Sequence, residues 1–78
     1  MTKLEKLIAK YKENPESISL KEMIKLLEHN GYLAVNAGGS HRIYKKEGVA
    51  EHILLAIHNN KLKYGYATRY KKILYPDD

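Results

Sequence analysis

The sequence contains no cysteine, which excludes disulfide frameworks, zinc sites built on thiolates and cysteine nucleophiles. Phenylalanine and tryptophan are also absent, so its seven tyrosines are the only aromatic side chains of the phenyl or indole type. The longest uninterrupted apolar run spans residues 53–57 and is far too short to cross a bilayer. Because charges interrupt the apolar residues at the N-terminus, we expect no secretory signal and a cytoplasmic protein.

The 78 residues suffice for one small domain, and a hydrophobic content of 44% suffices for one core. Lysine and arginine outnumber the acidic residues by 14 to 9, which gives a formal net charge of +5. Residues 1–30 hold six lysines against five glutamates, whereas residues 31–76 hold eight basic residues against two glutamates. We therefore expect a surface for a polyanion, most simply nucleic acid, in the second half.

Two capping boxes predict two amphipathic helices in the first 30 residues. Thr2 with Glu5 begins the first helix, and Ser19 with Glu22 begins the second. Pro15 ends the first helix, because the residue before a proline disfavours the helical conformation. In each segment the apolar residues recur at helical spacing and form one stripe.

After Gly31, which suits the left-handed position that closes a helix, the apolar residues change to strand-like spacing. Three antiparallel strands are predicted at residues 32–35, 42–45 and 52–57, with turns at 37–39 and 46–48. Residues 58–61 are predicted to break the third strand, and a final helix is predicted from about Tyr64 to Tyr75. The order predicts an α+β fold in which helices pack on one face of a three-stranded sheet.

The first candidate for chemistry is the segment Gly38-Gly39-Ser40-His41-Arg42, followed by Tyr44. Two glycines allow a tight turn into a histidine at the start of a strand. An imidazole exchanges protons near neutral pH and suits acid or base catalysis at a ribose 2′-hydroxyl, while nearby cations stabilise the charge on phosphorus. Strand alternation places His41 and Arg42 on opposite faces unless a bulge re-aims one of them. The alternative interpretation is an ordinary hairpin turn with an exposed histidine.

Other polar groups are less specific. The four histidines are not spaced to bring three ligands to one metal, so we expect no metal site at His29, His41, His52 and His58. The segment 58–61 either orients a histidine or binds phosphate, or is simply a polar loop. Lys61 and Lys63 precede the final helix, whose N-terminus favours anions, although a solvated cationic face accounts for them equally well.

Three segments together resemble the HicA family of toxins, the small ribonuclease partners in HicA–HicB toxin–antitoxin pairs. They are the helix end Leu26–Tyr32 with its Asn-Gly-Tyr turn, the Gly39-Ser40-His41 signature followed by Tyr44, and Ile57–Lys61 with the final helix through Leu74. The resemblance covers residues 18–75 of a single domain spanning 1–78. The short members of the family begin near Ser19, so residues 1–15 look like an N-terminal helical extension.

The resemblance implies an α-β-β-β-α fold like that of double-stranded-RNA-binding domains, in agreement with the predicted order. It implies a metal-independent mRNA endonuclease, without a cofactor, whose essential histidine corresponds to His41. Candidates to support catalysis are Ser40, Tyr44 and His58. Many members of the family have proline before the later histidine, where this chain has Ile57, and this difference weakens the role that the resemblance assigns to His58. Candidates for RNA binding are Gly39, Arg42, Lys45, Lys61 and Lys63.

The resemblance also implies two partners, an mRNA and a HicB antitoxin that covers the active site, with no membrane and no small-molecule cofactor. In the reaction we expect, His41 moves a proton as the 2′-oxygen attacks phosphorus, leaving a 2′,3′-cyclic phosphate and a 5′-hydroxyl. Two other functions fit the same residues. One is a non-catalytic RNA-binding module of this fold, and the other is a protein-interaction module that docks a partner on its open sheet face or an edge strand.

Overall fold

Helices precede and follow a run of short strands, in the order that the sequence predicts. The computed structural model describes residues 1–36 and 38–76, so residue 37 of the predicted turn at 37–39 lies outside the described residues. The helical segments are α1 (Lys3–Glu13), η1 (Pro15–Ser17), α2 (Leu20–His29), α3 (Tyr66–Arg69) and α4 (Lys71–Leu74). The strands are β1 (Leu33–Ala34), β2 (His41–Lys45), β3 (Ile53–His58) and β4 (Lys61–Leu62).

Both predicted capping boxes are present. Thr2 Oγ1 accepts a hydrogen bond from the Glu5 N–H at 3.1 Å, and the Glu5 carboxylate accepts one from the Thr2 N–H at 2.9 Å. Ser19 and Glu22 repeat the arrangement at the start of α2. These reciprocal bonds satisfy N–H groups that the first turn of a helix leaves without partners, so the local sequence determines where both helices begin.

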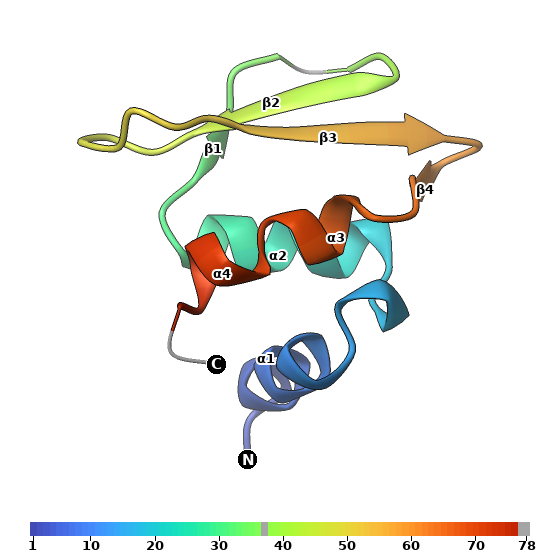
Figure 1. The fold of residues 1–78 in the computed structure, drawn as a ribbon, viewed down its shortest axis with the longest axis vertical. Coiled ribbons are helices and arrows are strands. Elements are labelled where there is room, and N and C mark those ends of the chain that lie inside the picture. The colour runs from blue at the N-terminus through green and yellow to red at the C-terminus, as the bar shows by residue number, and fades with distance from the viewer. Residues whose placement is uncertain (37, 77–78) are drawn as a thin grey trace.

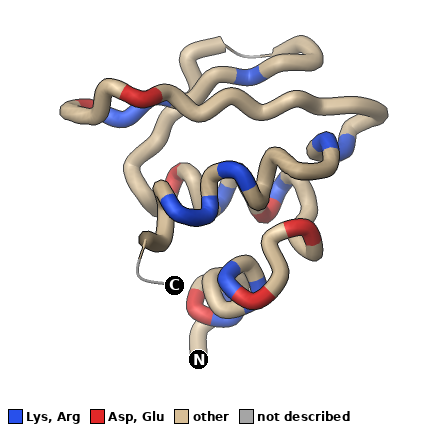
Figure 2. The backbone as a smooth tube through the Cα atoms, in the orientation of Figure 1, with Lys and Arg blue, Asp and Glu red and all other residues tan. Residues whose placement is uncertain are grey.

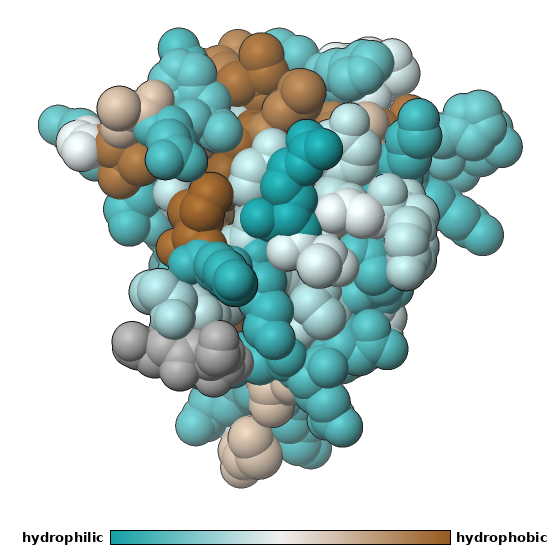
Figure 3. Space-filling view, viewed as in Figure 1, coloured by the Kyte–Doolittle hydropathy of each residue, from teal (hydrophilic) through white to brown (hydrophobic). Residues whose placement is uncertain are grey.

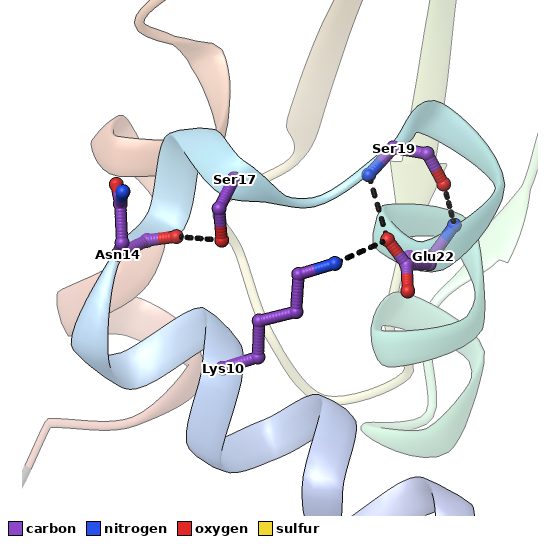
Figure 4. A network of polar contacts seen from close by, with 5 residues as sticks. All are labelled: Lys10, Asn14, Ser17, Ser19 and Glu22. Atoms are coloured by element: carbon purple, nitrogen blue, oxygen red, sulfur yellow. Dashed lines mark hydrogen bonds and ion pairs between the residues drawn. The ribbon is translucent and has the colours of Figure 1, made fainter.

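The contact between the first two helices includes an exposed polar network. Lys10 Nζ of α1 lies 3.3 Å from Glu22 Oε1 of α2, as Figure 4 shows. In the linker, the Ser17 hydroxyl donates to the Asn14 carbonyl oxygen at 2.7 Å. Such an exposed ion pair contributes about 1 kcal/mol or less, so the packing of apolar residues holds α1 in place.

The four strands form one antiparallel sheet in the order β1-β2-β3-β4. Figure 1 shows the sheet edge-on, with α2, α3 and α4 in a layer below it and α1 on their far side. The α+β class and the packing of helices on one face are therefore confirmed. Among the described residues, no helix covers the opposite face.

The pairing of β2 with β3 determines which side chains lie on each face. Tyr44 lies opposite Ile53, and both are buried against the helices on what we call the inner face. His41 lies opposite Ala56, an odd number of residues from the first pair. Because side chains alternate along a strand, His41 and Ala56 point to the other, outer face.

The core receives side chains from the helices and from the two long strands. Its members are Leu7, Tyr11, Ile18, Met23, Leu26, Leu27, Tyr32, Tyr44, Ile53, Leu55, Ala67, Tyr70 and Leu74. Tyr11 of α1 is 0% exposed, and its hydroxyl donates to the Ala67 carbonyl oxygen at 2.6 Å. Burial raises the pKa of this hydroxyl. The first helix is therefore packed into the core rather than laid on its surface.

The predicted end of the third strand at residues 58–61 is confirmed, but the count of three strands is wrong, because a fourth strand follows the turn. Strand β3 continues through His58, which pairs with Lys61 of β4. Asn59 and Asn60 have φ angles of 51° and 63°, the left-handed pair that a two-residue type I′ hairpin requires. Asparagine is one of the few residues that adopts this conformation readily, so the same residues that suggest a polar loop in fact make a tight turn.

The predicted continuous helix over 64–75 is also wrong. The structure has two short helices, α3 and α4, which meet at Tyr70, where φ is −99° and ψ is 3°. The Tyr70 hydroxyl accepts a hydrogen bond from the Leu54 N–H at 3.0 Å. Leu54 lies in the part of β3 that does not pair with β4. Ala67, Tyr70 and Leu74 are all buried. Apolar spacing therefore continues across the break and gives no sign of it.

A carboxylate from η1 holds the start of α3. Glu16 accepts hydrogen bonds from the Gly65 N–H and the Thr68 N–H, each at 3.0 Å, and from the Thr68 hydroxyl. Burial raises the pKa of Glu16, but these hydrogen bonds outweigh it and hold the pKa below the ordinary value of 4.5. Glu16 thus ties the N-terminal region to the turn between β4 and α3.

Removing the Tyr11 hydroxyl is expected to destabilise the fold. Tyr11→Phe leaves the buried Ala67 carbonyl without its partner, at a cost of about 1–2 kcal/mol. Tyr11→Ala adds a large cavity, so we expect a loss of about 3–5 kcal/mol or failure to fold. Urea denaturation followed by circular dichroism measures both values. Tyr64→Phe, at an exposed site, is the control and should change stability by less than about 0.5 kcal/mol.

Glu16→Gln is expected to lower stability at neutral pH by about 1–2 kcal/mol, because an amide oxygen replaces a charged helix cap. The folded pKa lies below the unfolded one, so the stabilisation is complete above about pH 5 and disappears as pH falls through the folded pKa. Urea midpoints at several pH values should therefore converge in acid. Glu51→Gln, in an exposed loop, should show no such convergence.

Candidate active site

The loop between β1 and β2 is held by hydrogen bonds on both sides of the predicted catalytic histidine. Gly39 has a φ of 88°, a left-handed conformation that side chains other than glycine rarely adopt, and leads into Ser40. The Ser40 carbonyl oxygen accepts from the Ile57 N–H at 2.7 Å, which joins the end of the loop to β3. His41 follows at once as the first residue of β2.

Asn36 holds the same loop by its side-chain amide. Its Nδ2 donates to the His41 carbonyl oxygen at 2.9 Å, and its Oδ1 accepts from the Ile43 N–H at 2.8 Å. The amide thus fixes the backbone on either side of Arg42 and positions His41. Asn36 is not among the predicted site residues, because a single asparagine near a glycine turn has no sequence pattern that distinguishes this role from that of an ordinary loop residue.

The register of the sheet brings two histidines to one pocket. His41 lies opposite Ala56 of β3, and His58 is two residues further along that strand, so both imidazoles lie on the outer face. Diagonal neighbours of this kind have Cα atoms roughly 7–8 Å apart. A pocket of about 370 Å³ is lined by Ser40, His41, Ala56, Ile57, His58 and Lys63.

The walls of this pocket differ in character. Ala56 is 5% exposed and lies between the two histidines on the outer face, so its small side chain leaves room above β3. His41, His58 and Lys63 are exposed polar groups around this apolar residue. The arrangement can hold an anion of phosphate size between two imidazole rings and an ammonium group.

Ser40 lies next to the His41 ring. Its Oγ is 3.3 Å from His41 Nδ1. The hydroxyl donates to Nδ1 in one tautomer of the ring and accepts from it in the other. In both tautomers the contact occupies Nδ1 and leaves Nε2 for a ligand.

The structure brings some, but not all, of the predicted site residues together. Lys61 lies opposite His58 on the outer face, beside the pocket. Lys45 is four residues from His41 on the same strand, roughly 13 Å away at about 3.3 Å per residue. Tyr44 is buried on the inner face and does not reach the pocket.

Arg42 also lies on the inner face, opposite Leu55, so the predicted separation of His41 and Arg42 is confirmed. The Arg42 side chain is half-buried. Its Nε is buried and has no hydrogen-bond partner among the described residues. The Arg42 side chain therefore lies on the opposite face of β2 from the two histidines.

A larger groove, of about 820 Å³, lies between α1 and α2 and includes His29. Its lining mixes leucines, lysines and glutamates, and none of the predicted site residues borders it. Within residues 1–36 and 38–76, no group of three or more His, Asp or Glu side chains is placed to hold a metal ion. No helix of the described chain is long and apolar enough to cross a membrane.

Charge and hydropathy are distributed unevenly around the pocket. Figure 2 shows basic residues at the hairpin of β3 and β4 and along α3 and α4. The outer face also carries exposed apolar side chains at its β1 end, including Leu33 at 67% and Val35 at 54% exposure, and Ile43 lies two residues from His41. Apolar atoms gather on the sheet side of the molecule in Figure 3.

A comparison of the amino-acid sequence with models of known families finds one match. Residues 20–72 match a family model described as the HicA toxin of bacterial toxin–antitoxin systems. No significant match was found among curated proteins or among solved structures. The matched range runs from the start of α2 into α4 and contains every residue that lines the histidine pocket. The resemblance of the three segments is thus confirmed, and the chain belongs to the HicA toxin family of bacterial toxin–antitoxin systems.

Proposed function

We propose that this toxin is a metal-independent endoribonuclease that cleaves mRNA, with His41 as its essential proton-transfer group. The observation that carries the proposal is that His41, His58 and Lys63 line one pocket on the face that the helices leave open. Two imidazoles beside a cation are the groups that cleavage of an RNA phosphodiester needs when no metal supplies the charge.

The reaction begins at the ribose next to the scissile phosphate. His41 Nε2 takes the proton of the 2′-hydroxyl as the 2′-oxygen forms a bond to the adjacent phosphorus. The bond from phosphorus to the 5′-oxygen breaks, and His58 gives a proton to that leaving oxygen. The products are a 2′,3′-cyclic phosphate and a 5′-hydroxyl, and proton exchange with water restores both rings. Atoms and charge balance without an added reactant.

The remaining residues hold the rings and the RNA. Ser40 is a positioning residue, because its contact with Nδ1 sets the direction of Nε2. Lys63 stabilises the additional negative charge on phosphorus in the transition state. Tyr44 supports the site from the core beneath β2, and Gly39 lets the loop approach the ribose.

Basic residues outside the pocket extend the RNA path. Lys61 lies beside His58, while Lys45 lies further along β2 and Arg42 emerges on the opposite face. A phosphate backbone that crosses the outer face can therefore contact Lys61 and Lys45 on either side of the pocket, whereas Arg42 lies on the other face of the sheet and does not meet it there. We propose that these residues contribute affinity and not proton transfer.

We further propose that a HicB-like antitoxin covers this face and neutralises the toxin in the cytoplasm, where mRNA is found. Exposed apolar side chains on the outer face support a protein partner. Leu33, Val35 and Ile43 expose apolar surface to water, and burying it against a partner is favourable. A partner that buries Ile43 must also come close to His41, which is two residues away on the same face.

His41→Ala is expected to reduce cleavage of a defined RNA by roughly 10²- to 10⁴-fold, in a buffer that contains a metal chelator. Incubation of the purified chain with end-labelled RNA, followed by analysis of the fragment ends, measures the rate and identifies the cyclic phosphate. His52→Ala is the matched control, since His52 is exposed and lies outside the pocket. Cleavage that requires magnesium, or that survives His41→Ala, would contradict the mechanism. RNA binding without any cleavage would favour the non-catalytic module instead.

His58→Ala tests the second proton transfer separately. We expect a loss of roughly a hundredfold on ordinary RNA, because the 5′-oxygen then leaves without a proton. A substrate with sulfur at the bridging 5′ position needs no such proton, so on it the His58→Ala variant should cleave within about tenfold of the wild-type chain. His41→Ala should stay inactive on both substrates. An equal loss for His58→Ala on both substrates would remove His58 from the leaving-group step.

A further inference from the structure

One tyrosine is exposed, while the other six are packed. Tyr64 is 84% exposed. The others are buried in the core or packed against it: Tyr11, Tyr32, Tyr44, Tyr66, Tyr70 and Tyr75. Within the described part of the chain, the Tyr64 ring makes no hydrogen bond, ring contact or cation–π contact. Covering an exposed aromatic surface is favourable, so this ring can gain free energy when a ligand stacks on it.

The backbone around Tyr64 is held firmly. The Lys63 N–H donates to the Ala56 carbonyl oxygen at 2.9 Å, which extends the pairing with β3, and the Tyr66 N–H donates to the Lys63 carbonyl oxygen at 3.3 Å. Tyr64 and Gly65 are the central residues of this turn, and Gly65 has the positive φ, 95°, that a type II turn requires at its third position. The Glu16 carboxylate accepts a hydrogen bond from the Gly65 N–H. The Tyr64 ring is therefore attached to a turn whose backbone is held by hydrogen bonds.

Tyr64 does not line the histidine pocket itself, but it is the next residue after one that does. It follows Lys63, which lines that pocket with His41 and His58, and the Cα atoms of successive residues are about 3.8 Å apart. An exposed aromatic beside a cation matches the repeating unit of RNA, because the cation binds a phosphate and the ring stacks on the base that follows. A tyrosine side chain has only two rotatable bonds, so little freedom is lost when a base covers it.

We propose that Tyr64 is the stacking platform for an unpaired nucleobase next to the cleaved phosphate, and that the substrate is therefore single-stranded RNA. The inference rests on the proposed function for the location of the phosphate. A base within a duplex is already paired and stacked on its neighbours, so only an unpaired base can present a free face to Tyr64. The ring tolerates any base, because every base has a π-face, and it contributes affinity with little sequence preference.

The test measures binding of a short unstructured RNA in the His41→Ala background, which prevents cleavage. Tyr64→Ala should weaken binding by roughly tenfold, while Tyr64→Phe should bind like the parent. The slope of log affinity against log salt should stay the same for Tyr64→Ala, because stacking releases no counterions. For Lys63→Ala the slope should fall by about 0.7, since one phosphate contact on a single strand is lost. Leu33→Ala, which truncates another exposed apolar side chain, is the control and should bind normally.

A second variant gives a direct signal. The chain has no tryptophan, so Tyr64→Trp introduces a single fluorescent indole that can still stack. Its emission should be quenched by the unstructured RNA, and much less by the same sequence in a perfect duplex or by inorganic polyphosphate. Equal quenching by RNA and polyphosphate, or parental affinity in Tyr64→Ala, would overturn the proposal. Neither result affects the nuclease assignment, which depends on the fragment ends and on His41.

Discussion

The register between β2 and β3 is the constraint on which the rest of the structure depends. Tyr44 and Ile53 lie opposite each other and are buried against the helices, so they set which residues of the two strands lie on the inner face. A slip of β2 by one residue would turn Tyr44 into solvent and turn His41 into the core. Burial of Tyr44 and Ile53 on the inner face therefore determines that His41 and His58 lie on the outer face.

The N-terminal region contributes to the site from the other side of the molecule. The family match begins at residue 20, yet Tyr11 and Glu16 lie before it and both bond to the region around α3. Glu16 binds the N–H of Gly65, in the turn that carries Lys63 and Tyr64. Helix α1, which precedes the matched range, is thus coupled to the turn that carries Lys63 through the core and through one carboxylate. Residues 20–72 alone would lack both contacts.

Local chemistry was predictable from the sequence where a single short-range rule decides the structure. Both capping boxes are such cases, as is the alternation that separates His41 from Arg42. The family resemblance was predictable from three short segments, two of which contain His41 and His58, and the structure places these two residues in the lining of one pocket.

Other features depend on contacts between distant segments. The turn at Asn59 and Asn60 was open to two interpretations, because asparagine suits both a polar loop and a type I′ hairpin. Pairing of Lys61 with His58 decides between them. The break at Tyr70 coincides with a hydrogen bond to Leu54, sixteen residues away, and helical spacing contains no information about that bond. Tyr64 was predicted to begin a helix, and only the turn around it shows that its ring is exposed.

On the proposed function, the open sheet face must serve an RNA and a protein inhibitor in turn. A domain of this size has one core, which covers one face of the sheet, so the other face is left for both ligands. Its cations favour a phosphate backbone, whereas the apolar residues at the β1 end offer the RNA little and favour a protein. The two ligands would share the pocket but not the β1 end. An inhibitor can therefore gain affinity from surface that the RNA does not use, and so displace RNA from a site whose charges favour the nucleic acid.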